Sequence, residues 1–264
     1  ATAGDINGDG YADVVVGAYL YDAPDADEGR AYLFRGGPTG LATTPAWTAE
    51  GNQTGAHFGG AVAAAGDVDG DGLDDVLVGA RDWNDAFADE GAAFLFRGTT
   101  GGLEPLPAWT KVGGQASAAF GGALASAGDV NGDGFSDVIV GADSFDEPEI
   151  DEGKAFVFLG STSGLDTVSI WTAQSDQPGA FFGRSVASAG DVDADGYSDL
   201  VVGAPLYDAP TTGEGRAFLY LGDAAGPSAT PAWTAQANFP ITKPAAQTAI
   251  NHFQLFIANP SSMI

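Results

Sequence analysis

Four stretches of the chain carry the same cluster of carboxylates at the same spacing. The stretch that begins at Asp67 has the pattern Asp-x-Asp-x-Asp-Gly-x-x-Asp, and related stretches begin at Asp5, Asp129 and Asp191. Alternate side chains along a tightly curled loop can converge on one point, and glycine after the third acid permits the sharp turn. Several hard oxygen ligands in flexible geometry suit Ca²⁺ better than Mg²⁺, which requires a stricter octahedron. The loops contain neither Cys nor His, which argues against zinc.

We therefore predict four calcium loops and about four bound ions. In each loop the side chains at positions one, three, five and nine, and the backbone carbonyl at position seven, are the candidate ligands. The candidate ligands are Asp5, Asn7, Asp9, Tyr11 and Asp13; Asp67, Asp69, Asp71, Leu73 and Asp75; Asp129, Asn131, Asp133, Phe135 and Asp137; and Asp191, Asp193, Asp195, Tyr197 and Asp199. Acid-rich turns can also be solvated Asx-turns, but four copies in phase favour calcium. Ala194 stands where the other loops have glycine, so we expect slight strain there and no lost ligand.

The elements that must position these loops repeat with the same 62-residue interval. Within one unit the apolar runs that begin at Phe58, Asp75 and Gly91, and the run around Trp109, predict four short strands punctuated by Gly, Pro and Asp. The first two of these runs flank the calcium loop. Four strands per unit, repeated in phase, predict an all-β chain folded as a β-propeller of four-stranded blades. The repeated Trp is interpreted as a packing residue between blades, with a ligand platform as the alternative.

The repeat defines the expected domain organisation. Residues 1–236 form the propeller repeats, with units near 1–57, 58–119, 120–181 and 182–236. The first unit starts at its calcium loop, so it is expected to lack its own inner strand. Residues 237–264 break the pattern. We expect this C-terminal tail either to supply a ring-closing strand beside residues 11–18 or to be disordered. If the ring does not close alone, a homo-oligomer is expected.

Charge excludes several classes of partner. The chain has 36 acidic and 9 basic residues, a formal net charge of -27 and no cysteine. Nucleic-acid binding requires the opposite sign, and an anionic membrane surface is disfavoured for the same reason. No apolar run approaches the length of a membrane span, so membrane insertion is not expected. Such an acidic chain should repel itself or hold cations.

The sequence around Phe58 and Asp75, "FGGAV…GDVDGDGLDDVLVGA", resembles the FG-GAP repeat of the integrin alpha-subunit N-terminal β-propeller. The resemblance implies a calcium loop between the first and second strands of each blade. It also implies a non-enzymatic module that binds extracellular ligands, although integrin propellers have seven blades and this chain has four motif copies. Related repeats resemble parts of bacterial surface proteins, a fungal lectin and a phospholipase.

The function hypothesis is a secreted or cell-surface binding module for cell adhesion, in which Ca²⁺ is structural and a protein or glycan ligand binds the loop face. One alternative is a carbohydrate-binding lectin, with Tyr21, Trp83, Phe145 and Tyr207 as candidate platforms. Another is a non-catalytic domain of a secreted hydrolase. No nucleophile elbow, zinc motif or P-loop is present, and the two histidines form no catalytic constellation. The Glu of the repeated Glu-Gly pair is expected to brace a turn, with a ligand or second metal surface as the alternative.

Overall fold

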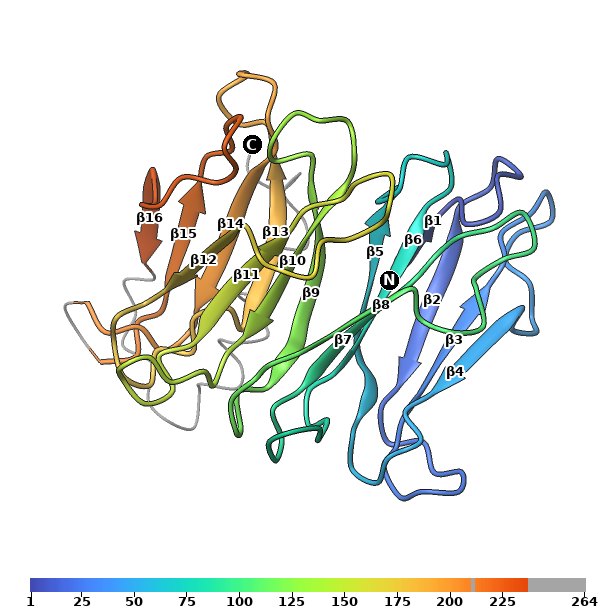
Figure 1. Cartoon of the computed structure of the whole chain (residues 1–264), viewed down its shortest axis with the longest axis horizontal. Helices are drawn as coiled ribbons and strands as arrows, with labels where there is room; N and C mark the ends of the chain where they lie inside the picture. Colours follow the sequence, from blue (N-terminus) through green and yellow to red (C-terminus); the bar gives the residue numbers. More distant parts are fainter. Residues whose placement is uncertain (210–211, 237–264) are drawn as a thin grey trace.

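The computed structural model describes residues 1–209 and 212–236, and the elements in this part of the chain are sixteen β-strands. The strands form four separate four-stranded sheets that follow one another along the chain (Figure 1). Within the described part, no helical segment has the length and apolar character that crossing a membrane requires. The predicted all-β fold is confirmed, and the four sheets are the blades of the predicted β-propeller.

Each sheet contains four strands that are consecutive in sequence. The first sheet consists of β1 (Thr2–Gly4), β2 (Asp13–Ala18), β3 (Arg30–Phe34) and β4 (Trp47–Glu50). The second consists of β5 (Phe58–Gly66), β6 (Asp75–Ala80), β7 (Ala92–Phe96) and β8 (Trp109–Val112). The third consists of β9 (Phe120–Gly128), β10 (Asp137–Ala142), β11 (Lys154–Phe158) and β12 (Trp171–Gln174). The fourth consists of β13 (Ser185–Gly190), β14 (Asp199–Ala204), β15 (Arg216–Tyr220) and β16 (Trp233–Gln236).

The first sheet differs from the others in its inner strand. We expected the first unit to lack this strand, but β1 is present as a three-residue strand that pairs antiparallel with β2. Thr2 lies opposite Val14 and Gly4 opposite Asp13, whereas β5 has nine residues. The few residues before the loop suffice because Gly4 takes the same left-handed backbone conformation, φ 81°, as Gly66 before the second loop, φ 79°. The predicted ring-closing strand falls in residues 237–264, outside the described residues.

The inner strands bring the sheets together. β5 contacts β1 and β9, and β9 contacts β13, so neighbouring sheets meet along their first strands. In Figure 1 the first sheet and the last sheet lie at opposite ends of the row of blades. The described residues therefore form an arc of four blades.

Two-sided burial explains why the second strands are apolar without alternation. Every residue of β6 is buried, because Val76 and Val78 face the first sheet while Leu77 faces the third. Burial of a Val or Leu side chain contributes about 1.5–3 kcal/mol. Hydrophobic contact on both faces of the strand thus joins consecutive blades into one stack.

The repeated tryptophan lies between blades, as predicted. Trp47 is buried, stacks edge-on against Phe96 of the next blade at 4.8 Å, and donates its indole N–H to the Glu104 carbonyl at 2.9 Å. Trp109 and Trp171 repeat both contacts with their own next blades. Trp233, in the last blade, is 49% exposed.

A pair of glycines forms the closest contact between blades. A Cβ placed on Gly79 would lie 2.0 Å from the carbonyl oxygen of Gly121, and one on Gly17 would lie 1.9 Å from that of Gly59. These distances are far inside van der Waals contact, so the backbones touch directly. Gly79 belongs to the repeated Gly-Ala pair and Gly121 to the repeated Phe-Gly pair. The contact explains why both motifs contain glycine.

In the second repeat the Glu of the Glu-Gly pair braces the loop between β6 and β7, in the role expected for it. Glu90 is fully buried, and its Oε1 accepts hydrogen bonds from the backbone N–H groups of Asp85 and Phe87, both at 3.0 Å. Its Oε2 accepts another from Gly114 at 2.9 Å. A buried carboxylate with three such donors is a structural acceptor.

Candidate metal centres

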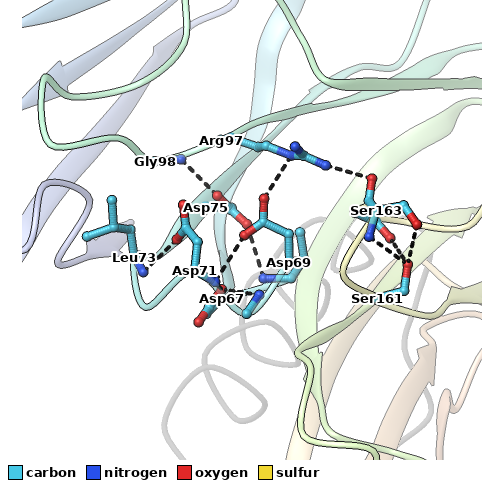
Figure 2. Close-up of polar contacts among 12 residues, drawn as sticks. Asp67, Asp69, Asp71, Leu73, Asp75, Arg97, Gly98, Ser161 and Ser163 are labelled. Carbon is cyan, nitrogen blue, oxygen red and sulfur yellow. Dashed lines mark hydrogen bonds and ion pairs between the residues drawn. The ribbon is translucent and has the colours of Figure 1, made fainter.

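The four acidic loops connect the first and second strands of the four sheets, at one end of the blades. In the second loop the Asp67 carboxylate fixes the turn, since its Oδ1 accepts hydrogen bonds from the N–H groups of Gly70 at 2.7 Å and Asp71 at 3.1 Å. Its Oδ2 accepts from Gly72 at 2.9 Å. Figure 2 shows the side chains of this loop gathered along one tight turn. The corresponding first acids accept the same kind of backbone bonds in the other loops.

The loop backbone follows the expected course. The glycine after the third acid takes a left-handed conformation in every loop, for example Gly72 at φ 89°. Ala194 adopts φ 63°, a conformation that a residue with a Cβ rarely takes, so the predicted strain in the fourth loop is borne out.

The carboxylates converge in two of the loops. One oxygen each from Asp67, Asp69 and Asp71 lie within 4.8 Å of one another, and the same holds for Asp191, Asp193 and Asp195. The first and third loops contain an amide at position three. Asn7 and Asn131 donate their side-chain N–H groups to Asp9 and Asp133 at 3.1 and 2.9 Å. The oxygen-only donor set and its convergence fit a hard divalent cation.

The acid at position nine has a structural role that the sequence analysis did not identify. Asp75 is 1% exposed, and its two oxygens accept hydrogen bonds from Val68 at 3.1 Å and Gly98 at 2.8 Å. The aspartates at the same position in the other loops make the equivalent pairs of bonds. Asp75 thus ties the loop to the end of β7. Glycine recurs every 62 residues at the position of Gly98, and this recurrence is the feature of the sequence that could have indicated the contact.

Backbone hydrogen bonds also connect each loop to the next. The Asp5 carbonyl accepts from the N–H of Asp74 at 3.3 Å, and the Asp67 carbonyl accepts from Ser136 at 2.9 Å. The Asp129 carbonyl accepts from Ser198 at 2.8 Å. Each link joins the first acid of one loop to the residue before the last acid of the following loop. An ion that orders one loop would therefore act on its neighbour.

The backbone N–H of the residue at position seven holds that residue in place by donating to the carboxylate at position five. Leu73 donates to Asp71 Oδ1 at 2.9 Å, and Tyr11, Phe135 and Tyr197 make the same bond in their loops. The side chain at this position packs against a glycine of the preceding loop, as Phe135 does against Gly70. That the carbonyl at position seven binds metal remains a prediction.

An arginine lies beside the second loop. Arg97 Nε is 3.1 Å from Asp69 Oδ2, and Arg97 also donates to the Ser163 carbonyl at 2.7 Å in the next blade (Figure 2). Its charge opposes an incoming cation. The four acids of the second loop therefore have one positive charge beside them before any ion binds. The four acids of the fourth loop do not, because Leu221 stands at the position equivalent to Arg97.

Burial makes Asp75 and Asp137, the ninth-position acids of the second and third loops, harder to deprotonate in the absence of a cation. Burial raises the pKa of Asp75 to about 7, against the opposing effect of its two backbone donors, and nearby Asp69 and Asp71 raise it further. Burial likewise raises the pKa of Asp137 to about 7. A divalent ion would reverse this effect by favouring the charged form.

The stability of the metal-free protein is therefore expected to fall as the pH rises from about 4 to about 7. Between the ordinary aspartate pKa and the raised values, the folded state holds more protons than the unfolded state, so deprotonation favours unfolding. With calcium present we expect the calcium-dependent gain in melting temperature to grow over the same range. Thermal unfolding at several pH values, with chelator and with calcium, measures both slopes. A calcium effect that is independent of pH would contradict this account.

Comparisons with known proteins agree with this geometry. The family described as "FG-GAP repeat" matches residues 120–158 and 182–220, and the family described as "FG-GAP-like repeat" matches residues 2–78. Together these matches cover more than half of the chain.

Integrin alpha subunits are among the proteins to which this chain is similar. Integrin alpha-4 of Xenopus laevis is 34% identical over 191 residues, which is 70% of this chain and 18% of the relative. Integrin alpha-PS5 of Drosophila melanogaster is 34% identical over 197 residues, 71% of this chain and 19% of the relative. Integrin alpha-IIb of Homo sapiens is 36% identical over 167 residues, 58% of this chain and 15% of the relative. The chain thus spans less than a fifth of the length of these relatives.

Proposed function

Because the chain belongs to the FG-GAP repeat proteins, we propose that it is a calcium-stabilised propeller that acts as an extracellular or cell-surface binding module. Calcium has a structural role in this proposal, and the module is not an enzyme. Its similarity to integrin alpha subunits supports an adhesion-type function.

One observation carries the calcium part of the proposal: four acidic loops in phase, each linked to the next by a backbone hydrogen bond. The donors are carboxylate and amide oxygens, which calcium accepts in flexible geometry. Four ions would also offset part of the net charge of -27. Abundant calcium outside the cell would fill sites of this kind, which supports the proposed location.

Calcium titration by calorimetry tests this proposal. We expect about four ions per chain, one for each loop. Asp193→Ala combined with Asp195→Ala removes two oxygen ligands from the fourth loop and is expected to reduce the number to about three. Glu149→Ala removes an acid that is exposed on a different loop, so it should leave the number unchanged. A chain that binds no calcium, or a double variant that binds as many ions as the original chain, would show that the loops are ordinary turns.

The face for a protein or glycan ligand is proposed to lie at the other end of the blades. Since the strands are antiparallel, the loops between second and third strands lie opposite the metal loops. They include residues 19–29, 81–91 and 143–153, which differ more between repeats than the metal loops do. Binding residues on variable loops carried by a rigid scaffold are a common arrangement.

A lectin is the second candidate, favoured by one groove. Trp83, Pro105 and Leu106 line a cavity of about 490 Å³ between the first two blades. Leu106 is 74% exposed, and Trp83 packs edge-on against Phe94 at 5.3 Å. Of the other predicted platforms, Phe145 and Tyr207 also pack against a phenylalanine, and Tyr21 lies under the Arg30 guanidinium.

If the ring does not close within one chain, the two ends of the arc are where a second copy would pack. Trp233 at one end is exposed, whereas its three counterparts are covered by a following blade. At the other end Val16 is 43% exposed, whereas its counterpart Val78 is buried against the preceding blade. Head-to-tail association would cover both surfaces, and a mass measurement in solution would decide whether it occurs.

A further inference from the structure

A polar cavity of about 540 Å³ lies near the inner strands, at the end of the blades away from the metal loops. Its walls come from the residues that follow β2 and β6 and from those at or before the beginnings of β5, β9 and β13. The lining residues that matter here are Tyr19, His57, Arg81, Asp82 and Arg184. A cavity of this volume is within the range of small-ligand sites.

The repeat breaks down at this cavity. Tyr19, Arg81 and Asp143 occupy one equivalent position in three successive repeats, and Gly60, Gly122 and Arg184 occupy another. The second strands, in contrast, keep the pattern Asp, three apolar residues, Gly and Ala in all four repeats. Residues that the repeat does not dictate therefore line this cavity.

The arginines show the same division. Four of the six arginines in the sequence occupy repeated positions, as the pairs Arg30 and Arg216 and Arg35 and Arg97. Each pair makes one repeated contact. Arg30 and Arg216 lie over the rings of Tyr21 and Tyr207, and Arg35 and Arg97 donate to carbonyls of the next blade. The remaining two, Arg81 and Arg184, both line the cavity.

Arg81 is the less engaged of these two cations. Arg184 Nη1 donates to Asp143 Oδ2 at 2.6 Å, and Asp143 is 4% exposed. Arg81 contacts Asp143 and Asp82 only at 3.7 Å, beyond hydrogen-bond distance, and its side chain is 36% exposed. The Arg81 guanidinium thus has donors available for a carboxylate, which it can bind with two parallel bonds.

Hydrogen-bonding and aromatic groups lie beside this cation. His57 Nδ1 and Asp82 Oδ2 are 2.5 Å apart, and Tyr19 meets the His57 ring edge-on at 5.8 Å. Tyr19 is 50% exposed, so its ring is open to a ligand. A carboxylate acceptor beside an open aromatic ring suits the hydroxyl groups and the apolar face of a sugar ring.

We propose that this cavity binds an acidic monosaccharide of the hexuronate type. The ligand carboxylate binds Arg81, its hydroxyls donate to Asp82, and its ring lies against Tyr19. The inference rests on the proposed function, because it names the ligand class of that binding module. An acidic peptide side chain fits less well, because it brings no hydroxyl groups to donate to Asp82 and no sugar ring to lie against Tyr19.

The test compares methyl α-D-glucuronide with methyl α-D-glucoside, which has a neutral hydroxymethyl group in place of the carboxylate. Binding to the calcium-loaded protein is followed by NMR chemical shift titration. We expect the glucuronide to bind at least about tenfold more tightly, and Arg81→Gln to remove at least about tenfold of its affinity, as for a hydrogen bond to a charged group. Lys111→Gln removes the same charge outside the cavity and should change the affinity less than about twofold.

Several results would overturn the proposal. These are equal affinity for the two glycosides, binding to Arg81→Gln as tight as to the original chain, or no binding of either glycoside. N-acetyl-aspartate amide binding as tightly as the glucuronide would instead assign the cavity to an acidic peptide. If Arg81→Gln does not fold, Tyr19→Ala serves in its place and should weaken the glucuronide. Calcium stoichiometry is measured separately, so failure here is distinct from failure of the calcium proposal.

Discussion

Gly79→Ala is expected to destabilise the protein by about 3 kcal/mol or more, at the upper end for an overpacked site. The new methyl group would lie 2.0 Å from the Gly121 carbonyl oxygen, which is a backbone atom and cannot rotate away. The second and third blades must separate to admit it. For a chain of this size the melting temperature should fall by about 6 °C or more, measured by thermal unfolding in calcium.

Gly37→Ala is the matched control. Its nearest heavy atom, the Gly40 carbonyl oxygen, would lie 3.8 Å from the new methyl group, and Gly37 does not have a left-handed backbone conformation. Alanine there should be neutral or should stabilise by up to about 1 kcal/mol, because it restricts the unfolded chain. Equal losses from Gly37→Ala and Gly79→Ala would mean that the blade contact has no special importance.

Removal of calcium is expected to have the other large effect. An ion that binds only the folded state stabilises it by about 2.7 kcal/mol at a concentration one hundred times its dissociation constant. Four such sites give on the order of 10 kcal/mol, which is comparable to the whole stability of a typical domain. We therefore expect excess chelator to lower the melting temperature by at least about 20 °C, or to unfold the chain at room temperature.

Restoring the metal provides the control for chelation. Calcium in excess over the chelator should return the melting temperature to its original value, and Mg²⁺ at the same concentration should return only part of it, since it keeps its waters. The same melting temperature with chelator and with calcium would rule out the structural role. Full recovery with Mg²⁺ would show that the loops do not prefer calcium.

The strands could be predicted because the repeat supplies four copies of each signal. The second strand of each sheet begins at Asp13, Asp75, Asp137 or Asp199, as the apolar runs ending in Gly-Ala predicted. The fourth strand of each sheet begins at the repeated Trp. The three-residue strand β1 was missed. Its few residues show no period of their own, and it is a strand only because β2 provides a partner.

The candidate metal loops could be predicted as well, but not all of their contacts. The spacing of Asp67, Asp69 and Asp71 follows from local chain geometry, which sequence displays directly. The bond from Gly98 to Asp75 and the bond from Ser136 to Asp67 depend on how strands and blades pack. The cavity at Arg81 was missed for a related reason, since it is assembled from residues that depart from the repeat.

The chain of backbone bonds between loops has a consequence for how calcium is taken up. Loops joined in series behave as a one-dimensional array with nearest-neighbour coupling. The second and third loops each have a linked neighbour on both sides. Occupancy should therefore spread cooperatively along the row, and the binding curve should be steeper than that of four independent sites.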